Sequence, residues 1–171
     1  VITSVFIYFI ECKNLIGNIT VNENGDFIRE YTFNGKKIKK GMYSPLRQVE
    51  AQREVIRKIW ESKASGLVKL FGSKNFDYYR KVLVVVANQE TILNTSKAPK
   101  DIKSIVLRAD ALVRKIQSDL SHIRSDDSYS SKKNMELIAQ SYANLCINEN
   151  IDYYKYYKDK FCKNDISDFF E

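Results

Sequence analysis

A carboxylate and an ammonium group follow a run of apolar residues near the start of the chain. The run covers residues 5–10, and Glu11 and Lys13 come directly after it. Six consecutive apolar residues predict a strand that is buried on both faces. Because successive side chains of a strand point to opposite sides, residues two apart project to the same side. Glu11 and Lys13 could therefore hold a divalent cation and stabilise a developing anion, or form a plain salt bridge where the strand enters a solvated loop.

The composition is that of an ordinary soluble globular protein. The chain has 171 residues, of which 44% are hydrophobic and 29% are charged, so we expect one main domain. No apolar run approaches the roughly 18 residues of a membrane helix. The three cysteines form no C-x-x-C pair and there is one histidine, which argues against a disulfide framework and against a zinc site. These features predict a cytoplasmic protein that does not associate with membranes.

Charge is distributed unevenly along the chain. Residues 1–125 hold 22 basic and 12 acidic side chains, a net charge of +10, whereas residues 126–171 hold 6 and 9, a net charge of −3. A basic body favours a polyanionic partner, and nucleic acid before an anionic membrane. The polar residues 126–131 mark a linker. We therefore predict an α/β domain over residues 1–125 and a helical C-terminal extension over residues 126–171, which includes a tyrosine-rich and lysine-rich helix at 151–163.

Two Asn-Gly pairs predict tight turns between β-strands. Asn24-Gly25 precedes residues 27–33, whose alternating pattern suits a half-exposed antiparallel strand, and Asn34-Gly35 follows it. The next five residues contain four lysines. They are interpreted either as an edge strand guarded by charge or as an edge that contacts phosphate groups. The four residues are Lys36, Lys37, Lys39 and Lys40.

A helix is predicted from about residue 45 to 62. Ser44 supplies an N-cap and Pro45 the first helical position. An apolar stripe along this segment would pack on the sheet, and Gln48 lies one turn inside it, beside Arg47. Residues 63–80 suggest a long connection or a lid. They are followed by a second apolar strand at 81–87, a loop at 88–99, a short strand at 105–107 and a helix at 108–123.

This order of elements resembles the nuclease-related domain (NERD) family over residues 1–120. That family is a branch of the restriction-endonuclease-like PD-(D/E)xK superfamily. The resemblance rests on the apolar strand closed by E-x-K-N at residues 6–14, on G-x-[IV] at 17–19 and on P-x-x-Q at 45–48, with Asn88 after the later apolar strand. It implies a mixed β-sheet flanked by helices.

The resemblance also implies Mg²⁺-dependent, or Mn²⁺-dependent, hydrolysis of phosphodiester bonds in DNA. Glu11 would ligate the metal with the backbone carbonyl of Cys12, a donor set that suits Mg²⁺. Lys13 would position the attacking water and offset charge on phosphorus. Gln48 would orient water or a phosphate group. The nucleic-acid backbone would contact Lys36, Lys37, Lys39, Lys40 and Arg47.

One departure from the family concerns the metal site. The family places a metal-binding Asp, usually in an Ile-Asp pair, ten or more residues before its E-x-K. In this chain that position falls at or before Val1, and residues 1–10 contain no acid. We therefore expect either an N-terminally truncated enzyme of impaired activity or a domain that binds nucleic acid without cutting it. A protein-interaction domain of a larger DNA-processing assembly is the third hypothesis.

Overall fold

The computed structural model describes residues 1–63 and 75–144 of the chain. It divides into two compact units, Val1–Lys132 and Lys133–Glu171. Helix α5 (Lys132–Ala143) supplies the described structure of the second unit and lies within the predicted helical extension. The predicted helix at 151–163 and most of the connection at 63–80 lie outside the described residues. The expected domain boundary after residue 125 stays a prediction.

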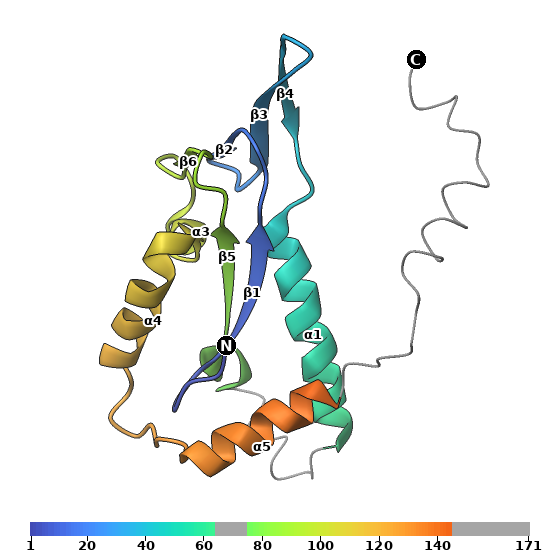
Figure 1. Ribbon diagram of the computed structural model, residues 1–171. Coiled ribbons are helices and arrows are strands. Elements are labelled where there is room, and N and C mark those ends of the chain that lie inside the picture. Colours follow the sequence, from blue (N-terminus) through green and yellow to red (C-terminus); the bar gives the residue numbers. More distant parts are fainter. Residues whose placement is uncertain (64–74, 145–171) are drawn as a thin grey trace, which may run out of the picture. The chain divides into compact units, whose positions relative to one another are not determined.

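Three parallel strands form the centre of the first unit. They are β1 (Ile7–Lys13), β5 (Arg80–Val86) and β7 (Val106–Arg108), in the order β1-β5-β7. Helix α1 (Pro45–Lys63) and helix α4 (Leu112–Ser121) lie on opposite sides of β1 and β5 (Figure 1). Parallel strands covered by helices on both faces are apolar along most of their length, as the sequence predicted for 5–10 and 81–87. The first predicted strand is confirmed with shifted bounds, because β1 begins at Ile7 and includes Glu11 and Lys13.

The side chains of β5 alternate between two apolar clusters. Val82, Val84 and Val86 belong to the cluster that contains Val49 of α1. Leu83 belongs to the other cluster, in which residues of β1 and α4 meet. This alternation has the two-residue period of a strand. It fixes which side chains of the neighbouring strand β1 can face α1.

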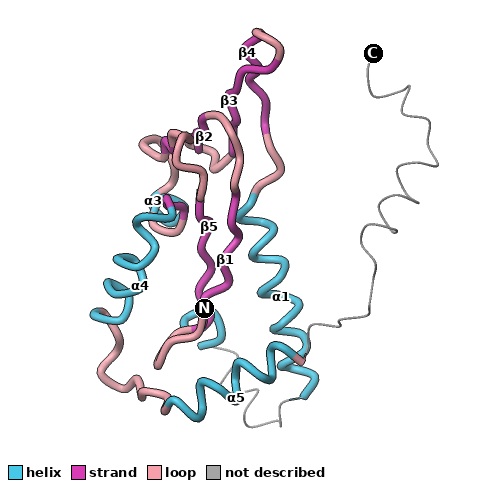
Figure 2. Tube along the Cα trace, viewed as in Figure 1, coloured by secondary structure: helices cyan, strands magenta, loops and turns pink. Residues whose placement is uncertain are grey.

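The second sheet is mixed and has the strand order β4-β3-β2-β6. Its strands are β2 (Asn18–Val21), β3 (Phe27–Phe33), β4 (Lys36–Gly41) and β6 (Leu93–Asn94). The expected turn at Asn34-Gly35 is confirmed, with φ angles of 48° and 73° that suit a type I′ hairpin. The lysine-rich segment is an edge strand of this sheet, while the short strand β6 arises within the segment expected to be a loop. Figure 2 shows the β3–β4 hairpin extending beyond the ends of β1 and β5.

Short elements complete the first unit. Helix α3 (Lys100–Lys103) precedes β7, and the 3₁₀ helix η1 (Ala109–Ala111) precedes α4. The predicted strand at 105–107 is thus β7, and the predicted helix at 108–123 is η1 followed by α4. Two sheets flanked by helices confirm the expected α/β class. None of the helices within the described residues is long and apolar enough to cross a membrane.

The segment after α4 is tied to the start of β5 by one carboxylate. The hydroxyl groups of Tyr78 and Tyr79 donate hydrogen bonds of 2.5 and 2.6 Å to the two oxygens of Asp127. The backbone N–H of Arg124 also donates to Asp127, at 2.9 Å. The guanidinium group of Arg124 lies 3.6 Å from the centre of the Tyr78 ring, a favourable cation–π distance. These contacts attach residues 124–127 to the α/β body.

Candidate nuclease site

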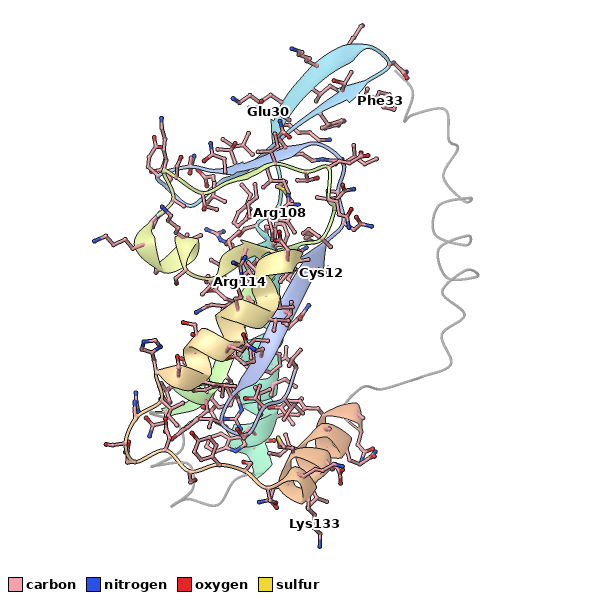
Figure 3. The ribbon with its side chains drawn as sticks, turned by 60° about the vertical axis from the view of Figure 1, so that its left-hand side comes forward. Cys12, Glu30, Phe33, Arg108, Arg114 and Lys133 are labelled. Atoms are coloured by element: carbon pink, nitrogen blue, oxygen red, sulfur yellow. The ribbon has the colours of Figure 1, made fainter. Side chains whose placement is uncertain are left out.

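Glu11 and Lys13 form an ion pair at the end of β1. Nζ of Lys13 lies 2.7 Å from Oε1 of Glu11, and the two side chains are 20% and 18% exposed. Phe9, two residues earlier on the same side of the strand, packs in the cluster that contains Val49 of α1. The ion pair therefore lies on the α1 side of β1. Cys12 projects to the other side and is exposed, at the end of β1 (Figure 3).

Helix α1 brings an amide to the same carboxylate. Its first turn is capped by Ser44, whose Oγ accepts a 3.3 Å hydrogen bond from the backbone N–H of Arg47. Two turns into the helix, Nε2 of Gln52 lies 3.5 Å from Oε2 of Glu11. Gln52 was not among the residues expected from the sequence. Its signal was the four-residue spacing from Gln48, which places both amides on one helix face.

Gln48 lies one turn before Gln52 on α1. The helix runs antiparallel to β1 (Figure 1), because Gln52 lies beside Glu11 near the end of the strand, whereas the next residue, Arg53, donates from Nη1 to the carbonyl of Arg80, which pairs with Ile7 at its start. Four helical residues advance about 6 Å and two strand residues about 6.6 Å. Gln48 therefore lies at the level of Lys13, as Gln52 lies at the level of Glu11. Among the described residues, Oε1 of Gln48 is buried without a hydrogen-bond partner.

The carbonyl of Cys12 points away from the parallel sheet. The backbone N–H of Ala87 donates to the carbonyl of Lys13 at 3.0 Å, so that carbonyl faces β5. Backbone groups of successive strand residues point to opposite edges, and the Cys12 carbonyl therefore faces the free edge of β1. Within the described residues no strand pairs with that edge, and its only backbone partners, Val1 and Ile2, bridge to Tyr8 and Ile7 at the other end of β1. This oxygen is not used by the β1–β5 ladder.

The donor atoms at the end of β1 are oxygens, the type of ligand that a hard divalent cation prefers. Mg²⁺ prefers carboxylate and carbonyl oxygens and keeps several waters, and Glu11 and Cys12 supply one oxygen donor group each. In the part of the chain that the structure describes, no three acidic, histidine or cysteine side chains converge. Lys13 also occupies one oxygen of Glu11. The residues thus fit a cation held mainly by water and phosphate oxygens.

The predicted phosphate-contacting residues fall in two places. The four lysines lie on β4, at the edge of the mixed sheet. Arg47 is exposed at the start of α1 and lines a cavity of about 630 Å³. The lining of that cavity includes Ser44 and Glu50 but neither member of the Glu11–Lys13 pair. The structure therefore does not bring Arg47, the lysines and the ion pair into one pocket.

The loop after the E-x-K motif is fixed against strand β3. Nε and Nη2 of Arg29 donate to the carbonyl of Ile16 at 2.9 and 2.7 Å. Gly17 has a φ of +99°, and a Cβ atom there would lie 2.4 Å from the carbonyl oxygen of Glu30. Only glycine allows this approach of the two backbones. The loop therefore sets the position of the hairpin with respect to β1.

The nuclease-related domain model matches residues 1–87, just over half of the chain. The chain belongs to the nuclease-related domain family. The matched residues include β1 with Glu11 and Lys13, the β3–β4 hairpin, and α1 with both glutamines. No curated protein and no solved structure matches the chain significantly. Membership in this family indicates a nuclease-related function and an interaction with nucleic acid, and dependence on a divalent metal is typical of it.

Proposed function

We propose that this nuclease-related domain hydrolyses phosphodiester bonds of DNA, with Glu11 and Lys13 as its central groups. One observation carries the proposal. The carboxylate and the ammonium lie 2.7 Å apart, four-fifths buried, at the end of a strand that is followed by β2 and then by the basic β3–β4 hairpin. Charges this deeply buried at the end of a strand are retained either as a pair or for a task. Binding and cleaving a phosphodiester gives both charges a task.

Each residue has a separate role in this reaction. Lys13 supplies positive charge where negative charge develops on the phosphate oxygens, and fixed charges aimed at the transition state are a major source of catalysis. Oε1 of Gln48 is a buried acceptor that can take a hydrogen bond from a water molecule. Gln52 holds Glu11 in place through its 3.5 Å contact. Mg²⁺ or Mn²⁺, held by Glu11 and the Cys12 carbonyl, would supply Lewis acidity and an activated water.

Binding of DNA rests on the basic surface. Residues 1–125 carry a net charge of +10, and the exposed Lys36, Lys37, Lys39, Lys40 and Arg47 contact phosphate groups in this proposal. Phosphate contacts release counterions, so the affinity should fall steeply with salt and show little sequence preference. The sparse cysteines support action in the reducing cytoplasm.

A second candidate is a nucleic-acid-binding module that does not cut. It is favoured by the composition of the site. Within residues 1–63 and 75–144, no group of three potential metal ligands converges, and the one carboxylate at the end of β1 is already paired with Lys13. In this alternative the basic surface binds DNA and the ion pair stabilises the strand end.

Cleavage and binding assays on one set of variants separate the two functions. The full chain is incubated with supercoiled plasmid and Mg²⁺, beside Glu11→Gln and Lys13→Gln. Glu54→Gln is the control, because Glu54 is a carboxylate of α1 paired with Arg57 on the same helix. We expect cleavage to fall about 100-fold in the first two variants, while binding and the control stay at the wild-type level.

Two other results of these assays would reject the proposed nuclease function. Binding by the wild type without any cleavage would reject the nuclease and support the binding module. Absence of affinity at about 50 mM salt, where phosphate contacts are strongest, would reject both and favour a protein-interaction domain.

A further inference from the structure

The register of the β3–β4 hairpin separates its lysines onto two faces. Residues directly opposite each other in an antiparallel pair share a face. The pairs Arg29–Lys40, Tyr31–Ile38 and Phe33–Lys36 make up one face, which we call the aromatic face. The pairs Glu30–Lys39 and Thr32–Lys37 make up the outer face. The four lysines are close together in the sequence, but the hairpin places two of them on each face.

The aromatic face continues the buried side of the mixed sheet. On that side Ile19 pairs with Arg29 and Val21 with Phe27, and Ile19, Val21 and Phe27 pack in the cluster with Val49 of α1. Beyond Arg29 the hairpin leaves this core. Phe33, near the tip of the hairpin in Figure 3, is 61% exposed. The face thus carries apolar rings into solvent on the same side of the sheet as α1.

Both aromatic residues of this face have cationic neighbours. The guanidinium carbon of Arg29 lies 4.3 Å from the centre of the Tyr31 ring, and Nζ of Lys40 lies 5.6 Å from it. Lys36 lies opposite Phe33. The six residues of the face include three cations, two aromatic rings and no acid. A flat ring beside unneutralised positive charge is the combination that binds a base and its phosphate together.

The outer face lacks both features. Lys39 is paired with Glu30 at 2.7 Å, which offsets part of its charge, and its remaining members are Thr32 and Lys37, neither of them aromatic. The two faces share one hairpin, one turn and the same number of lysines. They differ in the presence of rings and of an acid, so one serves as a control for the other.

We propose that the aromatic face binds unpaired nucleotides of a DNA strand, with a base stacked on Phe33 and the adjacent phosphates on Lys36 and Lys40. This inference rests on the proposed nucleic-acid-binding function and specifies its substrate class. In a duplex each base is covered by its neighbours, whereas unpaired bases offer a free π face. The preferred ligand is therefore a single strand or an unpaired stretch within a duplex.

Binding measurements on three ligands test the role of the bases. Fluorescence anisotropy is recorded for the full chain with a single strand of about 12 nucleotides, the same strand with abasic sites throughout, and the duplex. We expect the intact strand to bind about tenfold more tightly than the abasic strand, and more tightly than the duplex. Phe33→Ala should remove the preference for the intact strand. Tyr129→Ala, at a residue with 67% exposure, should keep it.

Two double variants with equal charge test the faces. Lys36→Gln with Lys40→Gln should weaken binding of the single strand more than Lys37→Gln with Lys39→Gln, because the second pair lies beside Glu30 and away from the rings. Equal affinity for intact and abasic strands, tighter binding of the duplex, or equal effects of the two pairs would overturn this inference while leaving DNA binding in place. Absence of affinity for every ligand at about 50 mM salt would instead overturn the proposed function.

Discussion

Gln52 and Lys13 hold different oxygens of the Glu11 carboxylate. Nζ of Lys13 lies 2.7 Å from Oε1, and Nε2 of Gln52 lies 3.5 Å from Oε2. One partner comes from the same strand and the other from α1, so the carboxylate links the strand to the helix. The orientation of the acid therefore depends on how α1 packs, and substitutions on this helix can affect chemistry on β1.

Replacing Gln48 should separate stability from activity. Its Oε1 atom is buried and unpaired among the described residues, and such an atom costs about 1 kcal/mol or more. Gln48→Met should therefore raise the free energy of unfolding by about 1 kcal/mol and lower plasmid cleavage. Urea denaturation and cleavage assays measure the two quantities. Gln52→Met is the control and should not raise stability, because it removes the contact with Glu11. A loss of stability in Gln48→Met would show that the oxygen has a partner in the folded protein.

Two glycines with positive φ should respond differently to alanine. Gly17 has a φ of +99°, and an added Cβ atom would lie 2.6 Å from Cβ of Tyr31. Gly35 has a φ of +73° and nothing within 4 Å of the added atom. We expect Gly35→Ala to cost about 1 kcal/mol from backbone strain alone, and Gly17→Ala to cost about 3 kcal/mol or more because a collision is added. Thermal and urea unfolding give both values, and equal losses would be inconsistent with close packing at Gly17.

Stability should fall at high pH through Tyr79. Its hydrogen bond to Asp127, with burial, raises the pKa of Tyr79 to about 12, above the value of about 10 for an unfolded chain. A group with a raised pKa stabilises fully below its unfolded pKa, and this contribution is lost as the pH rises through its folded pKa. The difference in unfolding free energy between wild type and Tyr79→Phe should therefore shrink between about pH 10 and 12. Urea denaturation at several pH values measures it, and a constant difference would contradict the expected titration.

The hydrogen bond between Tyr79 and Asp127 should also weaken at acid pH, when Asp127 becomes protonated. Burial alone would raise the pKa of Asp127, but hydrogen bonds from Tyr78 and Tyr79 outweigh it and lower that pKa. A carboxyl group with a depressed pKa stabilises fully above the unfolded value of about 4, and this contribution is lost as the pH falls from there through the folded pKa. The Tyr79→Phe difference should therefore also shrink in acid, so that its maximum lies near neutral pH.

Arg47 should contribute charge but no sequence preference. It is exposed at the start of α1, where the backbone N–H groups of the helix also attract anions. Arg47→Gln should weaken DNA binding uniformly across sequences and reduce the slope of log affinity against log salt by about 0.9. Arg114→Gln, at an exposed arginine of α4, is the charge-matched control. Equal effects of both changes would mean that net charge alone determines binding.

Local patterns in the sequence accounted for most elements of the fold. The apolar runs gave β1 and β5, the Ser44-Pro45 pair gave the start of α1, and the Asn-Gly pairs gave the hairpins, because each signal depends on neighbouring residues. Strand β6 was missed. Its two residues pair with β2 across more than seventy positions of sequence, and no local pattern encodes such a pairing.

The sequence predicted only the part of the candidate site that depends on local spacing. The two-residue spacing of Glu11 and Lys13 was enough to expect them on one side of a strand. The contact of Gln52 and the division of the hairpin lysines depend on helix packing and on strand register. Helix packing is set by tertiary contacts that a single sequence does not specify, whereas the register follows from the two-residue turn at Asn34-Gly35, which pairs Phe33 with Lys36.

Because β1 lies between two apolar clusters, the number of residues before Glu11 decides which side of the sheet its charged side chains face. Inserting or deleting one residue between Phe9 and Glu11 would turn both charged side chains toward α4 and leave Cys12 facing the glutamines of α1. A two-residue change would preserve the parity and keep the charges beside the helix. Evolution of this chain is therefore constrained in the number of residues between Phe9 and Glu11, and not only in their types.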